Sequence, residues 1–420
     1  MIVVVSLECR FKRTHDGHLW TQAESAYSFW KRYLEVFDGV RILARVEEVA
    51  APPPKYVRAD GPGVTVAAVP YYLGPWQYLA KASSVHRLLK NAVRSEDAVV
   101  MRVPSHLANC LFPAMLRQSH PYGVEVVGDP WEAFAPGVIQ HALRPFFRRY
   151  FAKQLRTQCL HACAASYVTQ WTLQQRYPAN KKGLSTAYSS VQLSERSPTV
   201  LSVGVSDVEL SEERTPSWSQ SGNVGDAVRL VMVGSLAQLY KGVDVALDAV
   251  ALCGREGLNV FLTIIGDGKF RRQLEQRAAR LGLTDRVVFR GQLPRGEAVQ
   301  VELDRSDLFI MPSRTEGLPR AMIEAMACGL PCIGSAVGGI PELLPPEDLV
   351  PPGDAKALAK KIREVVSDLN RMTLTSIRNW RRAEDFRDDL LKERRQTFYR
   401  FVRQRTEEWL QIARKQRRCA

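Results

Sequence analysis

The chain has 420 residues, of which 45% are hydrophobic, and it carries a formal net charge of +14 at pH 7. This length favours two domains over one, and the apolar content is sufficient for two cores. The charge favours an anionic partner (nucleic acid, anionic lipid or a phosphorylated substrate), while the absence of any run of 18 or more apolar residues excludes a membrane-spanning helix.

The cysteines and the N-terminus predict a cytoplasmic protein. None of the eight cysteines forms a CxxC pair or has a matching histidine cluster, so no zinc site is expected. Most of them lie in apolar runs, as small core residues do in a reducing compartment. The opening MIVVVSLECRFKR has only a short apolar run and is typical of a first β-strand, not of a signal peptide.

Apolar runs alternate with helical patterns through residues 1–196, which predicts a parallel sheet with crossover helices. The predicted strands are Ile2–Leu7, Val40–Val46, Val64–Ala68, Ala98–Arg102, Val124–Val127 and Ala165–Val168. The predicted helices are Ala23–Phe37, Gln77–Val93, Ser105–Gln118 and Val138–Ala162.

Residues 197–226 are rich in Ser, Glu, Gly and Pro and are interpreted as an interdomain linker. A second alternating block, 227–378, follows. Its predicted strands are Val228–Val233, Val260–Ile265, Val287–Arg290, Leu308–Met311 and Pro331–Gly334. Its predicted helices are Val243–Cys253, Lys269–Leu281, Arg295–Asp304, Arg320–Cys328 and Ala355–Leu369. The charged tail, 379–420, is predicted to be helical, with a broken apolar stripe that needs a partner surface.

The most informative stretch is SDLFIMPSRTEGLPRAMIEAMACGLPCIGSAVGGIPELL, residues 306–344. A short strand ends in a polar turn that carries Glu316, and a helix begins near Pro319 with Glu324 one turn inside it. Ligands bind at the carboxyl ends of strands in open α/β sheets, and a helix N-terminus attracts phosphate. Two acids beside such an anion site predict that a nucleotide sugar binds here.

This stretch resembles the signature of glycosyltransferase family 4: a glutamate, seven residues, and a second glutamate. The resemblance extends into the Ala-Met-Ala-Cys-Gly-Leu-Pro that follows Glu324 and into Gly-Gly-Ile-Pro-Glu, and it covers roughly 228–366. It implies the GT-B fold, in which two doubly wound Rossmann-like domains face each other across a cleft. In that fold the first domain binds the acceptor, the second binds the donor, and a C-terminal helix returns to the first domain.

The resemblance also implies roles for individual residues. Glu324 would take the ribose hydroxyls of the donor, and Glu316 would contact the donor sugar. The phosphates would be held by backbone N–H groups in the segment Gly317, Leu318, Pro319 and Arg320. Pro319 itself has no N–H to donate. Loops bordering the nucleotide would include Gly234, Gly266, Gly268 and Arg290, although these glycines also suit simple turns.

Lys241 lies in the loop Val-Met-Val-Gly-Ser-Leu-Ala-Gln-Leu-Tyr-Lys-Gly, residues 231–242. A lysine there can neutralise a diphosphate as the glycosidic bond breaks. The family usually carries Arg and Lys in this loop, but Ser235 stands at the Arg position. A hydroxyl supplies no charge, so stabilisation of the leaving group would depend on Lys241 and the helix at 320, where Arg320 offers a second charge. A metal ion is therefore not required, and no cofactor is expected beyond the nucleotide sugar itself.

Acceptor contacts are expected from loops of the first domain. Gly17 and His18 follow the first strand, and Arg102 ends another. Many relatives carry a histidine near Gly128-Asp129, where this chain has none; Asp129 either does the corresponding work or is an ordinary turn residue before proline.

Residues 141–156, HALRPFFRRYFAKQLR, combine aromatic and basic side chains. One interpretation is a helix that rests on an anionic membrane, with Leu143, Phe147 and Phe151 on the inserted face. The other is that this face packs on its own sheet while the arginines are solvated.

The sequence thus predicts a retaining, metal-independent hexosyltransferase. It would use a UDP- or GDP-linked sugar and a glycan or lipid-linked acceptor, in polysaccharide, exopolysaccharide or glycolipid synthesis. Two alternatives share the fold: a nucleotide-sugar epimerase, disfavoured by having no histidine after residue 161, and a degenerate scaffold, suggested by Ser235. A nucleic-acid-binding protein is disfavoured because no stacking or groove-reading motif is present.

Overall fold

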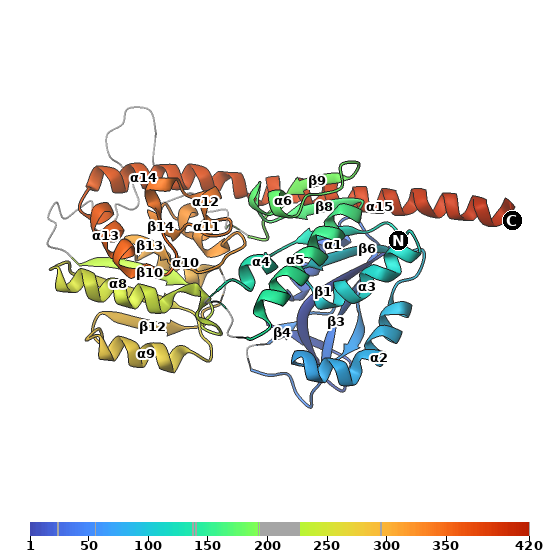
Figure 1. The fold of residues 1–420 in the computed structure, drawn as a ribbon, viewed down its shortest axis with the longest axis horizontal. Helices are drawn as coiled ribbons and strands as arrows, with labels where there is room; N and C mark the ends of the chain where they lie inside the picture. Colours follow the sequence, from blue (N-terminus) through green and yellow to red (C-terminus); the bar gives the residue numbers. More distant parts are fainter. Residues whose placement is uncertain are drawn as a thin grey trace. The chain divides into compact units, whose positions relative to one another are not determined.

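The computed structural model describes residues 1–420 except 23–24, 55, 137, 139–140, 192, 194–226, 295 and 420. The chain divides into two compact units. Unit 1 comprises Met1–Pro130, Arg149–Tyr188 and Lys392–Ala420, and unit 2 comprises Trp131–Arg148 and Ser189–Leu391. Each contains a largely parallel sheet with helices (Figure 1). The predicted class of two Rossmann-like domains is confirmed; the predicted linker, 197–226, lies outside the described residues.

The sheet of unit 1 has its parallel strands in the order β5-β3-β1-β6-β7-β8-β9. Two short strands extend it, because β2 pairs antiparallel with the end of β1 and β4 pairs antiparallel with β2. The strands are β1 (Ile2–Arg13), β2 (Leu19–Thr21), β3 (Gly39–Glu48), β4 (Val57–Arg58), β5 (Val64–Pro70), β6 (Ala98–Val103), β7 (Gly123–Val126), β8 (Ala164–Tyr167) and β9 (Leu184–Ala187). All six predicted strands are present, and β2, β4 and β9 were not predicted.

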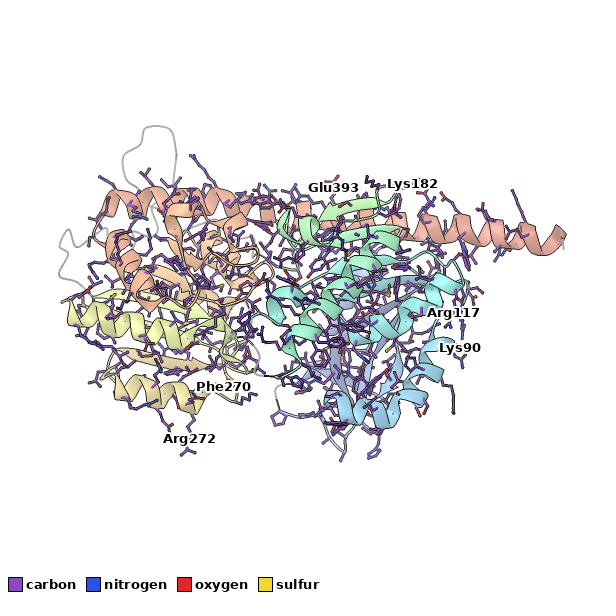
Figure 2. All side chains as sticks on the ribbon, in the orientation of Figure 1. Lys90, Arg117, Lys182, Phe270, Arg272 and Glu393 are labelled. Carbon is purple, nitrogen blue, oxygen red and sulfur yellow. The ribbon has the colours of Figure 1, made fainter. Side chains whose placement is uncertain are left out.

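The helices of this part of the chain are α1 (Tyr27–Leu34), α2 (Gly74–Ala92), α3 (His106–Arg117), α4 (Pro130–Ala133), α5 (Arg144–His161) and α6 (Thr172–Arg176). Side chains of α2, α3 and α5 share one apolar core with Val124 and Val126 of β7, so these helices cover the same face of the sheet. Lys90 of α2 and Arg117 of α3 point outward from unit 1 (Figure 2).

Glu125 lies on the opposite face of β7. Its carboxylate accepts a hydrogen bond from the last helix, α15 (Asp388–Cys419). Tyr33 Oη and Tyr399 Oη lie 2.7 and 3.0 Å from its carboxylate, and Tyr399 stacks on Tyr33 at 4.5 Å. The guanidinium of Arg102 lies 2.5 Å from the same carboxylate. The residues from Lys392 onward therefore pack on unit 1, as predicted for a returning helix.

The sheet of unit 2 is parallel, in the order β12-β11-β10-β13-β14-β15. Its strands are β10 (Val228–Val233), β11 (Val260–Ile265), β12 (Val287–Gly291), β13 (Leu308–Met311), β14 (Cys332–Ser335) and β15 (Leu349–Val350). β13 is a fully buried apolar run of the kind that a parallel sheet requires. The predicted strands match β10 to β14 to within a residue at each end.

The helical segments of unit 2 are η2 (Leu239–Lys241), α8 (Val243–Arg255), α9 (Arg271–Arg280), α10 (Glu297–Asp304), α11 (Arg320–Ala327), α12 (Ile340–Leu343), η3 (Pro346–Asp348), α13 (Ala355–Val366), α14 (Leu369–Ala383) and η4 (Glu384–Phe386). The predicted helix 355–369 ends earlier, because Asp368 caps a new helix by accepting a hydrogen bond from Arg371 N. Within the described residues, no helix is long and apolar enough to cross a membrane.

Candidate functional site

The strand order of unit 2 locates a topological switch point. From β10 the chain proceeds to β11 and β12 on one side, and it then returns to add β13, β14 and β15 on the other. At such a switch point the loops after the two central strands diverge, and ligands bind between them. The loop after β10 carries Lys241 and the loop after β13 carries Glu316, so these two predicted site residues flank the switch point.

The structure brings Lys241 and Glu316 into direct contact. Lys241 Nζ lies 2.7 Å from Glu316 Oε1, and Ser313 Oγ donates a hydrogen bond to the same oxygen, also at 2.7 Å. The Lys241 and Glu316 side chains are only 16% and 7% exposed, and Ser313 is fully buried. The switch point thus holds a largely desolvated ion pair whose carboxylate accepts a hydrogen bond from a serine.

The charge of Lys241 is maintained by its surroundings. Burial alone would lower the pKa of this lysine, but the charge of Glu316 and the hydrogen bond to it outweigh burial, so the pKa of Lys241 is raised. Arg320 acts on the pKa of Lys241 in the opposite direction as a smaller effect. The Lys241 ammonium is therefore protonated at neutral pH, and Arg320 belongs to the same electrostatic neighbourhood.

A second ion pair, not predicted, fixes the loop that carries Lys241. Arg314 makes two hydrogen bonds to the carboxylate of Asp244, at 2.8 and 2.7 Å, and donates to the carbonyl of Leu239 at 2.9 Å. The backbone N–H of Arg314 donates to the carbonyl of Tyr240 at 2.7 Å. Arg314 thus holds the β13 loop against the β10 loop on both sides of Lys241.

Helix α11 starts directly after Glu316, through Gly317, Leu318 and Pro319. No side chain caps this helix, because Pro319 occupies the N-cap position and has no acceptor group in its ring. Its N-terminus carries the positive end of the helix dipole beside Lys241 and Arg320. Glu324 lies one turn further along and is half-buried. The predicted order of turn, helix start and second acid is present.

Close backbone packing holds these loops together and requires glycine at two positions. At Gly242, where φ is +71°, an added Cβ would come within 1.9 Å of the Pro312 carbonyl oxygen. At Gly338, where φ is +53°, it would come within 2.0 Å of the Glu316 carbonyl oxygen. The predicted site glycines Gly234 and Gly266 are likewise in contact, since a Cβ on Gly266 would meet the Gly234 carbonyl.

The remaining donor-side residues lie on neighbouring loops. Ser235 is exposed, and its Oγ accepts a hydrogen bond from Ala237 N at 3.2 Å, which stabilises the turn after β10. Gly268 packs against the backbone of this same turn. Arg290 pairs with Glu302 of α10 at 3.2 Å. Sequence reasoning missed Arg271, which lies beside the β12 loop and donates to the Phe289 carbonyl at 3.0 Å.

Two predicted site residues of unit 1, Asp129 and Arg102, form ion pairs with other residues of unit 1. Asp129 is buried, with Oδ1 2.5 Å from Tyr177 Oη and Oδ2 paired with Arg176. Arg102 lies at the carboxyl end of β6 but forms the buried ion pair with Glu125. Both positions are explained by these structural contacts, and the proposed work of Asp129 and Arg102 on an acceptor stays a prediction.

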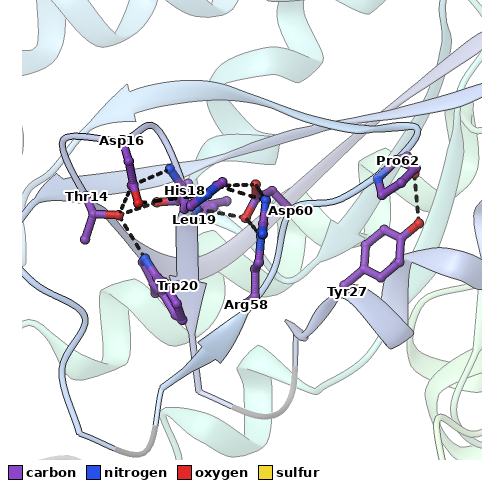
Figure 3. A network of polar contacts seen from close by, with 9 residues as sticks. All are labelled: Thr14, Asp16, His18, Leu19, Trp20, Tyr27, Arg58, Asp60 and Pro62. Carbon is purple, nitrogen blue, oxygen red and sulfur yellow. Dashed lines mark hydrogen bonds and ion pairs between the residues drawn. The ribbon is translucent and has the colours of Figure 1, made fainter.

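Gly17 and His18 lie in the hairpin between β1 and β2, which a polar network stiffens (Figure 3). Thr14 Oγ1 accepts from Trp20 Nε1 at 3.0 Å, and Asp60 Oδ1 accepts from Leu19 N at 2.9 Å. His18 Nδ1 lies 2.9 Å from Arg58 Nη2 and 3.4 Å from Asp60 Oδ2. The hairpin thus presents a partly exposed histidine at the carboxyl end of β1.

A further polar cluster, also missed, lies at the switch point of unit 1, where β1 neighbours β3 and β6. Glu8 Oε2 pairs with Arg45 Nη2 at 2.5 Å, and Glu8 Oε1 accepts from Ser105 Oγ and Leu107 N, both at 3.1 Å. Glu8 thereby satisfies the N-terminus of α3. Neither Glu8 nor Arg45 lies in a sequence motif, so only the strand order could have indicated that they meet.

The structure buries part of the predicted inserted face of 141–156. Phe147 and Phe151 are half-buried, and Phe147 packs 6.1 Å from the ring of Phe134. The exposed apolar side chains of this stretch are Leu143 at 56%, Phe146 at 60% and Tyr150 at 42%. The helix is rotated relative to the prediction because Leu155 and Cys159, further along α5, set which face enters the core.

Most of unit 2 also matches a known protein family. Residues 215–378 match the family described as Glycosyl transferases group 1. The chain carries a group 1 glycosyltransferase domain. The matched region includes β10 to β15 and therefore every predicted donor-site residue of unit 2.

Two curated proteins resemble the chain over different lengths. The chain is 28% identical over 342 residues to protein CapJ of Staphylococcus aureus, covering 81% of each chain. It is 39% identical over 141 residues to the amylovoran biosynthesis glycosyltransferase AmsK of Erwinia amylovora, covering 31% of this chain and 34% of AmsK.

Solved structures show that the transferase has the GT-B fold. Sucrose-phosphate synthase from Thermosynechococcus elongatus has a TM-score of 0.68 at 17% identity and covers 95% of this chain and 98% of its own. WaaG, a glycosyltransferase involved in lipopolysaccharide biosynthesis, has a TM-score of 0.61 at 16% identity, with coverages of 94% and 99%. HepE from Anabaena, solved with UDP and glucose, has a TM-score of 0.59 at 16% identity, with coverages of 97% and 99%.

Proposed function

We propose that this glycosyltransferase moves a hexose, with retention of anomeric configuration, from a UDP- or GDP-linked sugar to a glycan or lipid-linked acceptor. The observation that carries the proposal is the Lys241–Glu316 pair at the switch point of unit 2, next to the N-terminus of α11. The complex of HepE with UDP and glucose supports a nucleotide-sugar donor for a chain of this fold. The polysaccharide-synthesis relatives support the acceptor class.

In the proposed mechanism the donor diphosphate lies against the N-terminus of α11, with Lys241 as its counterion. As the bond from the anomeric carbon to the phosphate oxygen breaks, negative charge grows on the diphosphate. A fixed ammonium and a helix dipole in a largely desolvated site stabilise that charge. The leaving phosphate then helps to remove the proton of the acceptor hydroxyl on the same face of the sugar. Glu324 holds the ribose hydroxyls, and Glu316 contacts the sugar.

We also propose that the reaction needs no metal ion, because Lys241, Arg320 and the helix dipole supply positive charge where the diphosphate would lie. Turnover in EDTA should then equal turnover in the presence of Mg²⁺. A rate that collapses with EDTA and returns with Mg²⁺ would transfer the charge-neutralising role to a metal ion.

Binding of the donor requires an exchange of partners at Lys241. Without ligand the ammonium is paired with Glu316, so the diphosphate must compete with that carboxylate. Glu316→Gln should therefore raise the affinity for the free nucleoside diphosphate by about tenfold, or ~1.4 kcal/mol, while it lowers transfer because a sugar contact is lost. Calorimetric titration of the variant and the parent protein measures the first effect. An affinity that falls in Glu316→Gln would mean that Glu316 does not compete for Lys241.

Two measurements test the function itself. In a thermal-shift screen of UDP, GDP, ADP and their sugars, one nucleotide should stabilise the protein by about 2.7 kcal/mol at 100 times its Kd. The purified protein should then release that nucleotide from the matching sugar donor, and NMR of the product should show the anomeric configuration of the donor. Stabilisation by none of the nucleotides would refute the proposal, and conversion of the donor to its epimer would identify an epimerase instead.

A membrane contact is part of the proposal, since a lipid-linked acceptor lies at a bilayer. The charge of 141–156 supports contact with an anionic surface at the inner face of the plasma membrane, through the exposed Leu143, Phe146 and Tyr150 and not through Phe147 and Phe151.

A further inference from the structure

One face of unit 1 is covered by helices that contain no acidic residue. Helix α2, helix α3 and the part of α5 that belongs to unit 1, Arg149–His161, have no aspartate or glutamate in their sequences. They pack on the same side of the sheet through a shared core. Their basic residues are Lys81, Arg87, Lys90, Arg117, Arg149, Lys153 and Arg156. Figure 2 shows Lys90 and Arg117 projecting from this layer.

The first turns of α2 add an exposed apolar cluster to this basic layer. Trp76 is 82% exposed, the highest value among the large hydrophobic side chains that the structure describes, and Leu79 is 62% exposed. Residues three apart on a helix lie on the same side, so Trp76 and Leu79 form one protrusion, and Leu73 at the N-cap is 45% exposed beside it. These side chains contribute little to the core, so packing within unit 1 does not explain them.

The cations of α2 lie on the same side of the helix as this cluster. Arg87 follows Trp76 by eleven residues, and Lys90 follows Leu79 by eleven residues, a spacing close to three full helical turns. Both side chains are exposed. The apolar cluster and these two cations therefore share one face of α2.

We propose that this surface docks on an anionic lipid bilayer, with Trp76 and Leu79 of α2 inserted below the headgroups and Arg87 and Lys90 at the lipid phosphates. An aromatic and aliphatic protrusion bordered by cations is the composition of helices that lie in a membrane interface. Each lysine or arginine near an anionic leaflet adds to binding, and this layer has no acid to oppose it. A nucleic acid would use the cations and the tryptophan but not exposed leucines, because aliphatic side chains do not stack on bases.

The inference rests on the proposed function, because a lipid-linked acceptor gives the enzyme a reason to bind a bilayer. It adds α2 as an insertion point in addition to 141–156. Its test needs neither donor nor acceptor. A failed lipid experiment would therefore leave the proposed transfer reaction standing, and a failed transfer assay would leave the lipid surface standing.

The experiment is co-sedimentation of the full chain with vesicles of phosphatidylcholine and phosphatidylglycerol. The double variant Trp76→Ser/Leu79→Ser should lower the binding constant by about tenfold or more. The charge variant Arg87→Glu/Lys90→Glu should lower it by a similar factor and weaken its dependence on salt. All four positions are exposed, so the fold should persist, and a thermal melt checks this.

Matched controls are Leu374→Ser, an apolar side chain 69% exposed on α14, and Lys360→Glu, a lysine 76% exposed on α13. Both should leave vesicle binding unchanged. Undiminished binding of folded Trp76→Ser/Leu79→Ser would overturn the proposal. So would equal binding of the parent protein to vesicles of phosphatidylcholine alone, or binding to RNA but not to vesicles.

Discussion

Replacing Lys241 with alanine will lower the rate of sugar transfer by about 10²–10³-fold, the usual cost of losing one charge-stabilising donor at a developing anion. The physical reason is the position of its ammonium at the switch point of unit 2, where the pKa of Lys241 is raised and the side chain is largely withdrawn from water. Initial rates at saturating donor measure the effect.

Lys241→Met provides the second variant, because it keeps the aliphatic stem and removes only the charge. It should lose the same factor as Lys241→Ala. The matched control is Lys360→Ala on α13, which removes a lysine that is 76% exposed and pairs with Glu364. A parental rate in both Lys241 variants, with folding intact, would show that the diphosphate is neutralised elsewhere.

The second large effect is expected at Glu324. Glu324→Ala removes a charged acceptor for the ribose hydroxyls, and hydrogen bonds to charged groups contribute about 1.5–3 kcal/mol, so nucleotide affinity should fall by roughly 10- to 100-fold. Alanine is the best helix former, so α11 should persist. Calorimetric titration with the nucleotide chosen by the thermal-shift screen gives the Kd.

Two further variants make this result specific. Glu324→Gln keeps one carbonyl acceptor without the charge and should give an intermediate Kd. Glu364→Ala, on α13, removes an acid that pairs with Lys361 and should leave the Kd unchanged. If Glu324→Ala binds the nucleotide as the parent protein does, Glu324 is not in the ribose site.

The sequence predicted the fold of unit 2 well because its signals are local. Strands such as Val260–Ile265 are short, continuous apolar runs, and the segment from Glu316 to Glu324 keeps turn, helix start and acid in a fixed order. Spacing alone could therefore place these residues at one end of the sheet. The helix boundaries near Val366 and Leu369 were less clear, because Asp368 acts as a cap that interrupts a pattern which otherwise continues.

Pairings between distant residues were not predictable from one sequence. The sequence around Lys241 does not indicate that Glu316 is its ion-pair partner. It also does not indicate that Arg314 pairs with Asp244. The same limit explains Asp129, which looked like a free turn residue until Arg176 and Tyr177 were placed beside it. On α5, aromatic residues at helical spacing could not show which side faces the core, so a membrane-facing and a core-facing interpretation of Phe147 and Phe151 both stayed open.

The most direct measurement is a crystal structure with the nucleoside diphosphate selected by the thermal-shift screen. The diphosphate should lie against the N-terminus of α11, with Lys241 Nζ within hydrogen-bonding distance of a phosphate oxygen and separated from Glu316, and with Glu324 on the ribose. Density for the nucleotide at any other place, or a bound diphosphate with the Lys241–Glu316 pair still closed, would contradict the proposed donor site.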